Sequence, residues 1–266
     1  MMRGNMKMRA LLAVVWLAAC AARADEGFSF VQLTDLHLGG GTDHVQRATA
    51  AVDAVNALPM PIACVLVTGD LGRDDLDDSN ALARVRRVLG RIHAPVHVIP
   101  GNHDVLAKRW TATTNAFVFG IGPMQTNVTY HGVTFLLLTD ETLHDEHLAA
   151  AHPDCDPLGW LDRELQTVEG RPVIVVHHRP EVEDFHDNAF HPGWPEAIRA
   201  RWTEIVNRHH VCAEIVGHFH RDELHWLGNV PVYAASSLAG YYGRQASFRI
   251  YTWRDGHLSY RTVYLP

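Results

Sequence analysis

The sequence has little of several features that would place it in a special class of protein. Only 4 of its 266 residues are cysteine, only 2 are lysine, and acidic residues outnumber Lys and Arg by 30 to 23. The low cysteine content excludes a disulfide-dense scaffold, and the apolar fraction of 47% excludes a disordered chain. The formal charge of -7 disfavours a sequence-independent nucleic-acid binder, which needs a basic surface.

No apolar run is long enough to cross a membrane, although the amino end has the pattern of a targeting signal. Residues 1–24 begin with Arg3, Lys7 and Arg9, which precede ten apolar residues from Ala10 to Ala19. A spanning helix needs about 20 apolar residues, so this order predicts a secretory signal rather than an anchor helix.

The predicted signal can end in two ways, and the sequence leaves both open. Small residues before Asp25 allow cleavage after Ala24, which defines a signal of residues 1–24. Leu17-Ala18-Ala19-Cys20 resembles a bacterial lipobox, with a signal of residues 1–19 and a lipid on Cys20. We therefore predict export, to the periplasm or to a lipid anchor in the outer membrane if the source is bacterial.

Removing residues 1–24 makes the remaining domain more acidic. Four positive charges and no negative ones are lost, which leaves 19 basic against 30 acidic residues and a formal charge of -11. Cys64, Cys155 and Cys212 remain, so one disulfide at most can form, and their spacing predicts no zinc-cysteine site.

Short β-rich runs alternate with helical stretches along most of the chain, and the pattern becomes hairpin-like after residue 220. Strands are predicted over Phe28–Thr34, Ile62–Thr68, Val96–Ile99, Val133–Thr139, Val173–Val176, Val211–Val216, Leu224–Leu227, Val230–Ala235, Phe248–Trp253 and Leu258–Tyr264. Helices are predicted over His44–Leu58, Ser79–Leu89, Leu158–Val168 and Pro195–Arg208. The sequence predicts one α/β domain over residues 25–266, with two packed sheets and outer helices.

Two connecting segments are also informative. Tyr130-His131-Gly132-Val133 has the pattern of a hairpin turn. The segment from Glu181 to Trp194 is rich in aromatic residues and is interpreted either as a loop that shapes a substrate site or as an ordinary surface excursion.

Polar residues with metal-binding chemistry follow five of the predicted strands. In chain order they are Asp35-Leu36-His37, Gly69-Asp70, Gly101-Asn102-His103-Asp104, His177-His178-Arg179-Pro180 and Gly217-His218-Phe219-His220. Open α/β sheets collect their ligands at the carboxyl ends of strands, so these groups are expected to meet. Any one of them is unremarkable, but the ordered set predicts a single functional site.

The residue types define the chemistry of that site. Carboxylate, amide oxygen and imidazole together suit Fe, Mn, Co or Zn, whereas an all-oxygen site would suit Mg or Ca. Two such ions about 3.5 to 4 Å apart lower the pKa of a shared water and clamp the oxygens of a phosphoryl displacement.

The five motifs resemble those of the calcineurin-like metallophosphoesterases, whose signature has D-x-H, G-D, G-N-H-D/E, H and G-H-x-H in this order. The resemblance spans Asp35 to His220. It implies an α/β fold, a four-layer αββα sandwich of two mixed β-sheets flanked by helices. It also implies two divalent metals, the first bound by Asp35, His37 and His220, the second by Asn102, His177 and His218, with Asp70 as the bridge.

The same resemblance implies that His103 contacts substrate rather than metal. His103 is placed to protonate the leaving oxygen, and Asp104 is placed to orient its ring. The substrate contacts predicted beside the metals are His37, Asp70, Asn102, His103 and His220.

Two positions leave alternatives. The family's usual H-H-P-P pattern selects His177 as the ligand, which we prefer, whereas the shorter H-x-P form selects His178. Arg73 stands three residues after Asp70, where purple acid phosphatases have a tyrosine. This difference favours the class III branch of cyclic-nucleotide and glycerophosphodiester phosphodiesterases. Arg73 is interpreted as a solvated residue or as a contact to the substrate phosphate.

The sequence therefore predicts an exported, metal-dependent phosphoester hydrolase that uses attack by metal-bound hydroxide on a small phosphodiester or phosphomonoester, with the diester slightly favoured. The rival is a non-catalytic exported metal-binding or scaffold protein on the same fold. A nuclease is disfavoured because the sequence has no basic patch with interleaved aromatic residues. The sequence does not indicate whether the protein is a monomer or an oligomer.

Overall fold

The computed structural model of the chain describes residues 27–186, 189–191 and 193–266. The predicted signal over residues 1–24, with Cys20, lies outside these residues and stays a prediction. Within the described ranges, no helix has both the length and the apolar character needed to span a bilayer.

The first sheet joins the amino-terminal part of the domain to its carboxyl end. Its strands lie in the order β13 (His257–Tyr264), β12 (Ser247–Arg254), β1 (Phe28–Leu33), β2 (Ile62–Thr68) and β3 (Val96–Ile99). β1, β2 and β3 are parallel to one another, whereas β12 pairs antiparallel with both β1 and β13. The carboxyl ends of β1, β2 and β3 therefore lie at one edge of this sheet.

The second sheet has a parallel centre and antiparallel edges. Its strands lie in the order β10 (Glu223–Leu227), β11 (Val230–Ala234), β9 (Ala213–Val216), β6 (Val173–Val176), β5 (Val133–Leu138) and β4 (Gln125–Tyr130). β5, β6, β9 and β11 are parallel, and β10 and β4 pair antiparallel with their neighbours. β5 and β6 at the centre are buried along their whole length and, apart from Thr134, are apolar, because the sheet is covered on both faces.

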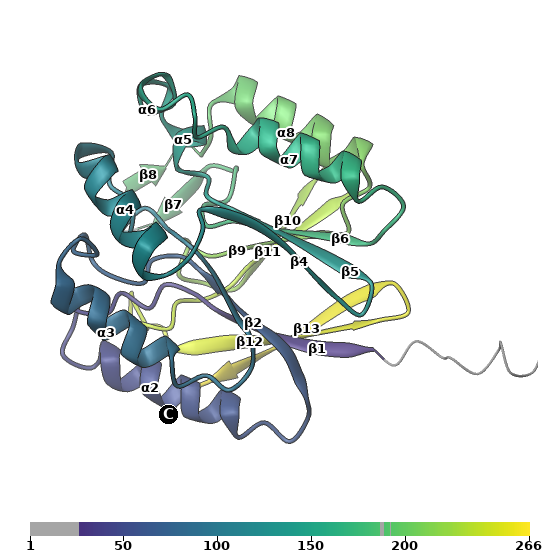
Figure 1. Cartoon of the computed structure of the whole chain (residues 1–266). Coiled ribbons are helices and arrows are strands. Elements are labelled where there is room, and N and C mark those ends of the chain that lie inside the picture. Colours follow the sequence, from purple (N-terminus) through teal and green to yellow (C-terminus); the bar gives the residue numbers. More distant parts are fainter. Residues whose placement is uncertain (1–26, 187–188, 192) are drawn as a thin grey trace, which may run out of the picture.

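Helices cover the outer faces of both sheets (Figure 1). On the first sheet these are α2 (His44–Asn56) and α3 (Ser79–Leu89), and on the second α7 (Pro157–Thr167) and α8 (Glu196–Arg208). Between the sheets lies a separate apolar core that includes Phe30, Leu66, Phe135, Val176 and Tyr251. The expected four-layer αββα sandwich of two mixed sheets is confirmed.

Most of the predicted helices and strands form, and several have the predicted bounds. The strands Ile62–Thr68, Val96–Ile99 and Val173–Val176 and the helix Ser79–Leu89 have the predicted bounds. The structure also has elements that the sequence pattern does not predict: β4, the 3-10 helix η1 (Ala107–Arg109), α4 (Trp110–Gly120), α5 (Glu141–His144) and α6 (Glu146–Ala151). The short antiparallel pair β7 (Asp184–His186) and β8 (Ala189–His191) is likewise not predicted. Cys64, Cys155 and Cys212 are free thiols.

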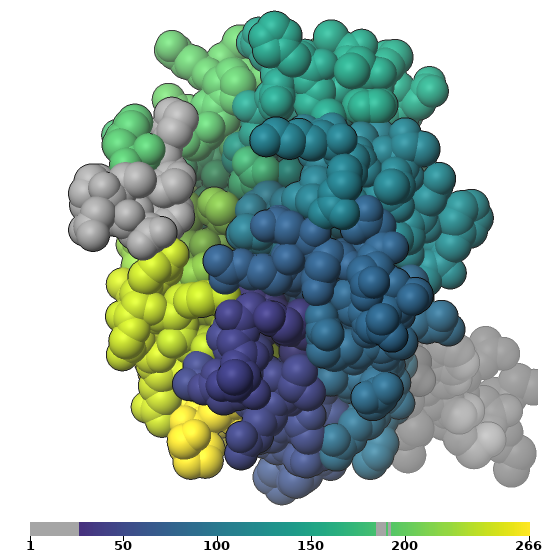
Figure 2. Space-filling model, turned by 90° about the vertical axis from the view of Figure 1, so that its left-hand side faces the viewer, coloured from purple at the N-terminus to yellow at the C-terminus, as the bar shows by residue number. Residues whose placement is uncertain are grey.

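The topology brings five strand ends to one edge of the sandwich. In the first sheet, β1, β2 and β3 are parallel, so they end at the same edge. In the second sheet, β6 and β9 are parallel and end at that edge as well. Figure 2 looks onto the side of the molecule that is at the left in Figure 1. The purple segment after β1, the blue segments after β2 and the yellow carboxyl-terminal region lie next to one another on this side.

Candidate metal centre

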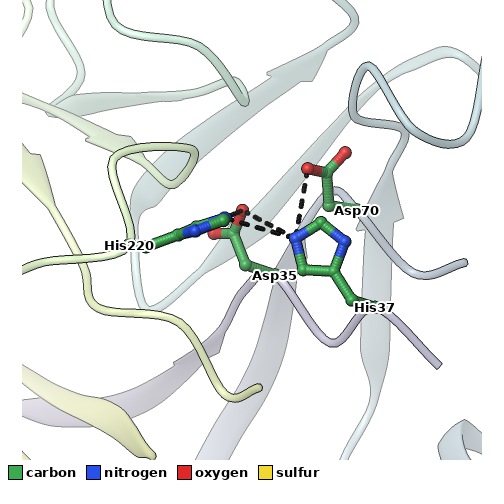
Figure 3. Close-up of side chains that lie close together, drawn as sticks. All are labelled: Asp35, His37, Asp70 and His220. Carbon is green, nitrogen blue, oxygen red and sulfur yellow. Dashed lines mark hydrogen bonds and ion pairs between the residues drawn. The ribbon is translucent and has the colours of Figure 1, made fainter. Parts of the chain in front are cut away.

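The first group of donor atoms lies where β1, β2 and β9 end. Asp35, His37, Asp70 and His220 are all buried, and their ligand atoms lie within 4.8 Å of one another (Figure 3). His37 Nε2 lies 3.2 Å from His220 Nε2 and 3.6 Å from Asp70 Oδ2. His220 Nε2 lies 3.0 Å from Asp35 Oδ1. Two ring nitrogens and two carboxylate oxygens thus face one point, a donor set that suits a borderline divalent ion.

The second group lies beside the first and includes residues from both sheets. Ligand atoms of Asp70, His178 and His218 lie within 4.8 Å of one another. His178 Nε2 lies 3.3 Å from Asp70 Oδ2 and 3.2 Å from Asn102 Oδ1. His178 Nδ1 donates a hydrogen bond to the carbonyl of Thr68 at 2.7 Å, so its Nε2 is turned toward the other donors. Histidines that bind metals are commonly oriented in this way.

One oxygen of Asp70 belongs to both groups. Asp70 Oδ2 is the atom near His37 in the first group and near His178 in the second. Asp70 Oδ1 instead accepts a hydrogen bond from the backbone N–H of His103 at 2.9 Å. This bond fixes the carboxylate with Oδ2 between the two groups, which is the geometry that a bridging ligand requires.

The backbone is strained at the same residues. Asp35, His37 and Asp70 have φ values of 53°, 44° and 54°, and His218 and His220 have values of 68° and 54°. Residues other than glycine rarely adopt this left-handed backbone region, and each one reduces the stability of the fold by of order 1–3 kcal/mol. Five strained positions with convergent donor atoms indicate that the fold maintains this arrangement for function rather than for stability.

The electrostatics of the site favour a bound cation. Burial lowers the pKa of His37 to about 4, so its ring is neutral and has a lone pair to offer. Burial also opposes ionisation of Asp70, but His178 and His37 hold the pKa of that carboxyl well below its ordinary value. Burial disfavours a charge on His178, yet Asp70 and Asp35 raise its pKa well above the ordinary value. The acids thus attract positive charge to the point that His178 Nε2 faces, and the residues fit a metal ion there.

The preference for His177 as the second-group histidine is corrected. His177 Nε2 lies 2.9 Å from Glu214 Oε2, and its ring packs against Trp202 of α8. Successive side chains alternate across a strand, so the side chain of His177 lies on the helix-covered face while that of His178 lies among the donors. The structure therefore places His178, not His177, beside Asn102 and Asp70.

The predicted role of Asp104 is also corrected. Its carboxylate is fully buried and accepts hydrogen bonds from the backbone N–H groups of Leu71, Gly72 and Gly101. It therefore ties the turn after β2 to the turn after β3 and does not orient His103. The partner of His103 is Asp74, whose Oδ1 accepts from His103 Nδ1 at 2.9 Å. His103 itself lies beside the donors, with its ring centroid 5.1 Å from that of His37.

Tyr241 is a residue of the site that the sequence does not predict. Its ring lies 4.9 Å from the rings of both His37 and His220, and its hydroxyl accepts a short hydrogen bond from Arg73. Tyr241 belongs to none of the five motifs, so no pattern in the sequence identified it. Arg73 is exposed, as one of the two interpretations had it, and its contact with Tyr241 holds its guanidinium at the rim of the site.

A cavity of about 550 Å³ opens beside the second group. Asn102, Arg179, Glu141 and His144 contribute to its wall. Arg179 Nη2 lies 2.6 Å from Glu141 Oε2, which fixes the guanidinium at the wall. The volume is in the range of pockets that hold small organic ligands.

Comparison with known proteins agrees with this site. Residues 28–222 match the sequence model of the calcineurin-like phosphoesterases, so the chain belongs to that family. It is similar to a probable cyclic nucleotide phosphodiesterase of Fibrobacter succinogenes, with 26% identity over 77% of this chain and 78% of that protein. A second one, from Rhodopseudomonas palustris, is 27% identical over 86% of this chain and 82% of that protein. The protein is therefore a metal-dependent phosphoric ester hydrolase.

Solved structures share the fold at low sequence identity. A dimetal phosphatase from Danio rerio has a TM-score of 0.63 at 15% identity, with 90% of this chain and 99% of that one covered. GAP50, the anchor in the inner membrane complex of Plasmodium, has a TM-score of 0.67 at 14% identity, with 90% and 84% covered. A phosphatase and an anchor thus share one fold, so the fold alone does not define an activity.

Proposed function

We propose that the protein uses two divalent ions to hydrolyse small phosphodiesters, with cyclic nucleotides as the favoured class. The observation that carries this proposal is Asp70 Oδ2, which lies between two groups of donor atoms. The two similar proteins, both probable cyclic nucleotide phosphodiesterases, support the substrate class. Fe, Mn, Co and Zn are the ions that the donor set suits.

The donor residues would hold two ions, with Asp70 available to both. The first ion would be held by Asp35, His37, Asp70 and His220, and the second by Asp70, Asn102, His178 and His218. When bound, such ions supply Lewis-acid stabilisation of phosphoryl oxygens and make a water acidic near neutral pH. Most of these donors are buried away from bulk water, so the charges of two bound cations would be weakly screened and would attract an anionic substrate strongly.

His103 is the proposed general acid. A water that has given one proton to the solvent attacks phosphorus as hydroxide, the ester P–O bond opposite it breaks, and His103 Nε2 gives its proton to the departing oxygen and regains one from the solvent. Asp74 Oδ1 holds His103 Nδ1, so the free Nε2 is the atom that can face the leaving group. This arrangement matches general-acid catalysis, which requires a positioned donor within hydrogen-bond reach.

The cavity beside Asn102 is proposed to hold the organic part of the diester. Arg179 and His144 offer polar contacts at its wall, while Val105, Leu106 and Leu148 offer apolar surface. A nucleoside combines a flat apolar base with hydroxyl groups, so it matches this mixture. A phosphomonoester of a small alcohol would leave most of the cavity to water, which is why the diester is favoured.

The test is a substrate panel with metal-reconstituted full-length protein. We expect hydrolysis of a 3′,5′-cyclic nucleotide to exceed that of a glycerophosphodiester and of p-nitrophenyl phosphate, and Asp70→Ala to abolish it. Ala107→Trp, which fills the cavity, is expected to reduce kcat/KM for the cyclic nucleotide about tenfold but to spare methyl p-nitrophenyl phosphate. Phe119→Trp, at a side chain 84% exposed, is the matched control. Absence of hydrolysis with all four metals would refute the proposal.

The alternative function is a non-catalytic metal-binding or scaffold role on this fold. Such a role would account for the two groups of donor atoms. It would not account for the hydrogen-bonded pair of His103 and Asp74, because neither residue belongs to those groups. Tight metal binding without turnover on the panel would support the alternative.

We also propose that the protein is exported and that it is either cleaved after Ala24 or lipidated at Cys20. The order of charged, apolar and small residues in residues 1–24 supports this. Intact-mass measurement of the native amino terminus distinguishes the two products, and an unprocessed amino terminus would contradict both.

A further inference from the structure

A third group of metal-ligating side chains lies outside the candidate metal centre. His177 follows β6, Glu181 lies four residues later, and Glu214 belongs to β9. One ligand atom of each lies within 4.8 Å of the others, and all three side chains are fully buried. None of the three belongs to the groups around Asp70, because the side chains of His177 and Glu214 face the helix-covered side of the second sheet, where Trp202 contacts both.

The orientation of His177 is that of a metal ligand. Its Nδ1 donates to the carbonyl of Arg179 at 3.0 Å and lies 3.3 Å from Asp140 Oδ2. Histidines that bind metals usually place one ring N–H against a carbonyl or carboxylate in this way, which leaves the other nitrogen for the ion. Here the other nitrogen, Nε2, faces Glu214 Oε2 at 2.9 Å.

Glu214 is prepared in the same manner. Its Oε1 accepts a hydrogen bond from Trp202 Nε1 at 2.9 Å, so Oε2 is the atom that points to the group. A hydrogen bond between His177 and Glu214 alone would satisfy both side chains. It gives no reason for a second carboxylate at the same place.

Glu181 supplies the independent observation. It has no exposed surface, and neither of its carboxylate oxygens hydrogen-bonds to another residue in the part of the chain that the structure describes. Leaving a buried carboxylate without a partner is costly, and proteins ordinarily pair such groups or use them to bind a metal. One of its carboxylate oxygens lies within 4.8 Å of the ligand atoms of His177 and Glu214.

We propose that His177, Glu181 and Glu214 bind one divalent cation of the zinc class, separate from the ions at Asp70. One imidazole and two carboxylates are a donor set that Zn²⁺ accepts, with a fourth position for water. The ion takes the place of the proton that the bond between His177 and Glu214 otherwise requires. Ligand bonds of about 2.1 Å need the two facing atoms to separate by only about half an ångström.

The site connects the segment that carries β7 and β8 to the second sheet. The backbone carbonyl of Glu181 accepts from Trp194 N at 3.2 Å, and the Trp194 ring packs 5.5 Å from the ring of His177 and 4.9 Å from that of Trp202. Arg179 and Val182, which line cavities beside the candidate metal centre, lie in the same segment. An ion at Glu181 would therefore stabilise the wall of the substrate cavity without contacting substrate.

The test counts metal in the full-length protein after loading with Zn²⁺ and removal of loosely bound ion. We expect about three zinc ions per chain, about two in Glu181→Gln and in Glu214→Gln, and about three in the control Glu141→Gln, a buried acid outside the group. Asp70→Ala is expected to retain about one ion, because the third site does not use Asp70.

A second measurement covers variants that fail to fold. Anomalous scattering at the zinc edge from wild-type crystals should show a peak within about 2.1 Å of His177 Nε2. Equal zinc content in wild type and Glu181→Gln, or no such peak, would overturn the site, and a proton shared by His177 and Glu214 would then occupy it. Hydrolysis of the substrate panel is a separate readout, so the proposed function can fail while this site stands, and the reverse.

Discussion

Removing the His103 side chain should affect substrates according to how much their leaving group needs a proton. A ribose oxygen leaves poorly as an alkoxide and requires an acid, whereas p-nitrophenolate departs without one. We therefore expect His103→Ala to lower kcat for a 3′,5′-cyclic nucleotide by about 10²- to 10⁴-fold. The loss for bis-p-nitrophenyl phosphate should be much smaller.

The structure also allows an estimate of how much Asp74, the hydrogen-bond partner of His103, contributes to kcat. The bond between His103 Nδ1 and Asp74 Oδ1 is 2.9 Å long, but the two side chains are 29% and 52% exposed. Solvent screening reduces such a bond to about 1 kcal/mol, so Asp74→Asn should lower kcat for the cyclic nucleotide by roughly fivefold. Asp77→Asn, in the same loop but paired with Arg109, is the matched control and should leave kcat unchanged.

The assay is steady-state hydrolysis of both substrates with the metal content of each variant measured in parallel. Metal content should not change, because the contact of His103 with Asp70 uses the backbone N–H, which the substitution leaves in place. Equal losses on the two substrates would refute a general acid. Loss of metal in His103→Ala would show that its side chain holds the donors together.

Four further substitutions follow from the geometry. His178→Ala should remove most metal from the second group and most activity, whereas His177→Gln should keep most of its turnover. The metal content and kcat of the two variants test this, and the reverse result would restore His177 as the ligand of the second group. Asp104→Asn replaces an acceptor of three backbone N–H groups and should lower the free energy of unfolding by about 2 to 3 kcal/mol, measured by urea denaturation; an unchanged midpoint would contradict its role. Arg73→Ala should raise KM several-fold with little change in kcat, because Arg73 contacts Tyr241 at the rim, and a change in kcat alone would contradict this.

The sheets and the order of the site motifs could be predicted because their signals are local. β2 and β6 are short apolar runs covered on both faces, and each ends in residues with ligand chemistry. The helix Trp110–Gly120 was missed because its sequence is rich in Thr and Phe and buries only Trp110, Thr113 and Phe117. The strand Gln125–Tyr130 lies at an edge and is only half-buried, so its pattern is weak.

The contacts that depend on two distant loops could not be predicted. Asp74 and Asp104 are both acids near His103 in the fold, and Asp104 is adjacent to it in the sequence. Only the path of the turn after β2, in which Asp74 has a φ of 60°, brings Asp74 to the imidazole. Tyr241 reaches the site in the same way, from a turn 21 residues beyond His220 that no motif marks.

The choice between His177 and His178 as the metal ligand depends on which face of the sheet each side chain after β6 lies on. In β6, Val173 and Val175 pack against the helices α7 and α8, and Ile174 and Val176 pack between the sheets. Continuing this alternation places His177 on the helix side and His178 on the inner side, at the edge where Asp70 lies. All four valine and isoleucine residues are equally buried, so the sequence has no polar face from which to read the alternation. A strand buried on both faces therefore hides which of two adjacent histidines faces the metal, and here it directs the second one to a separate buried group of acids.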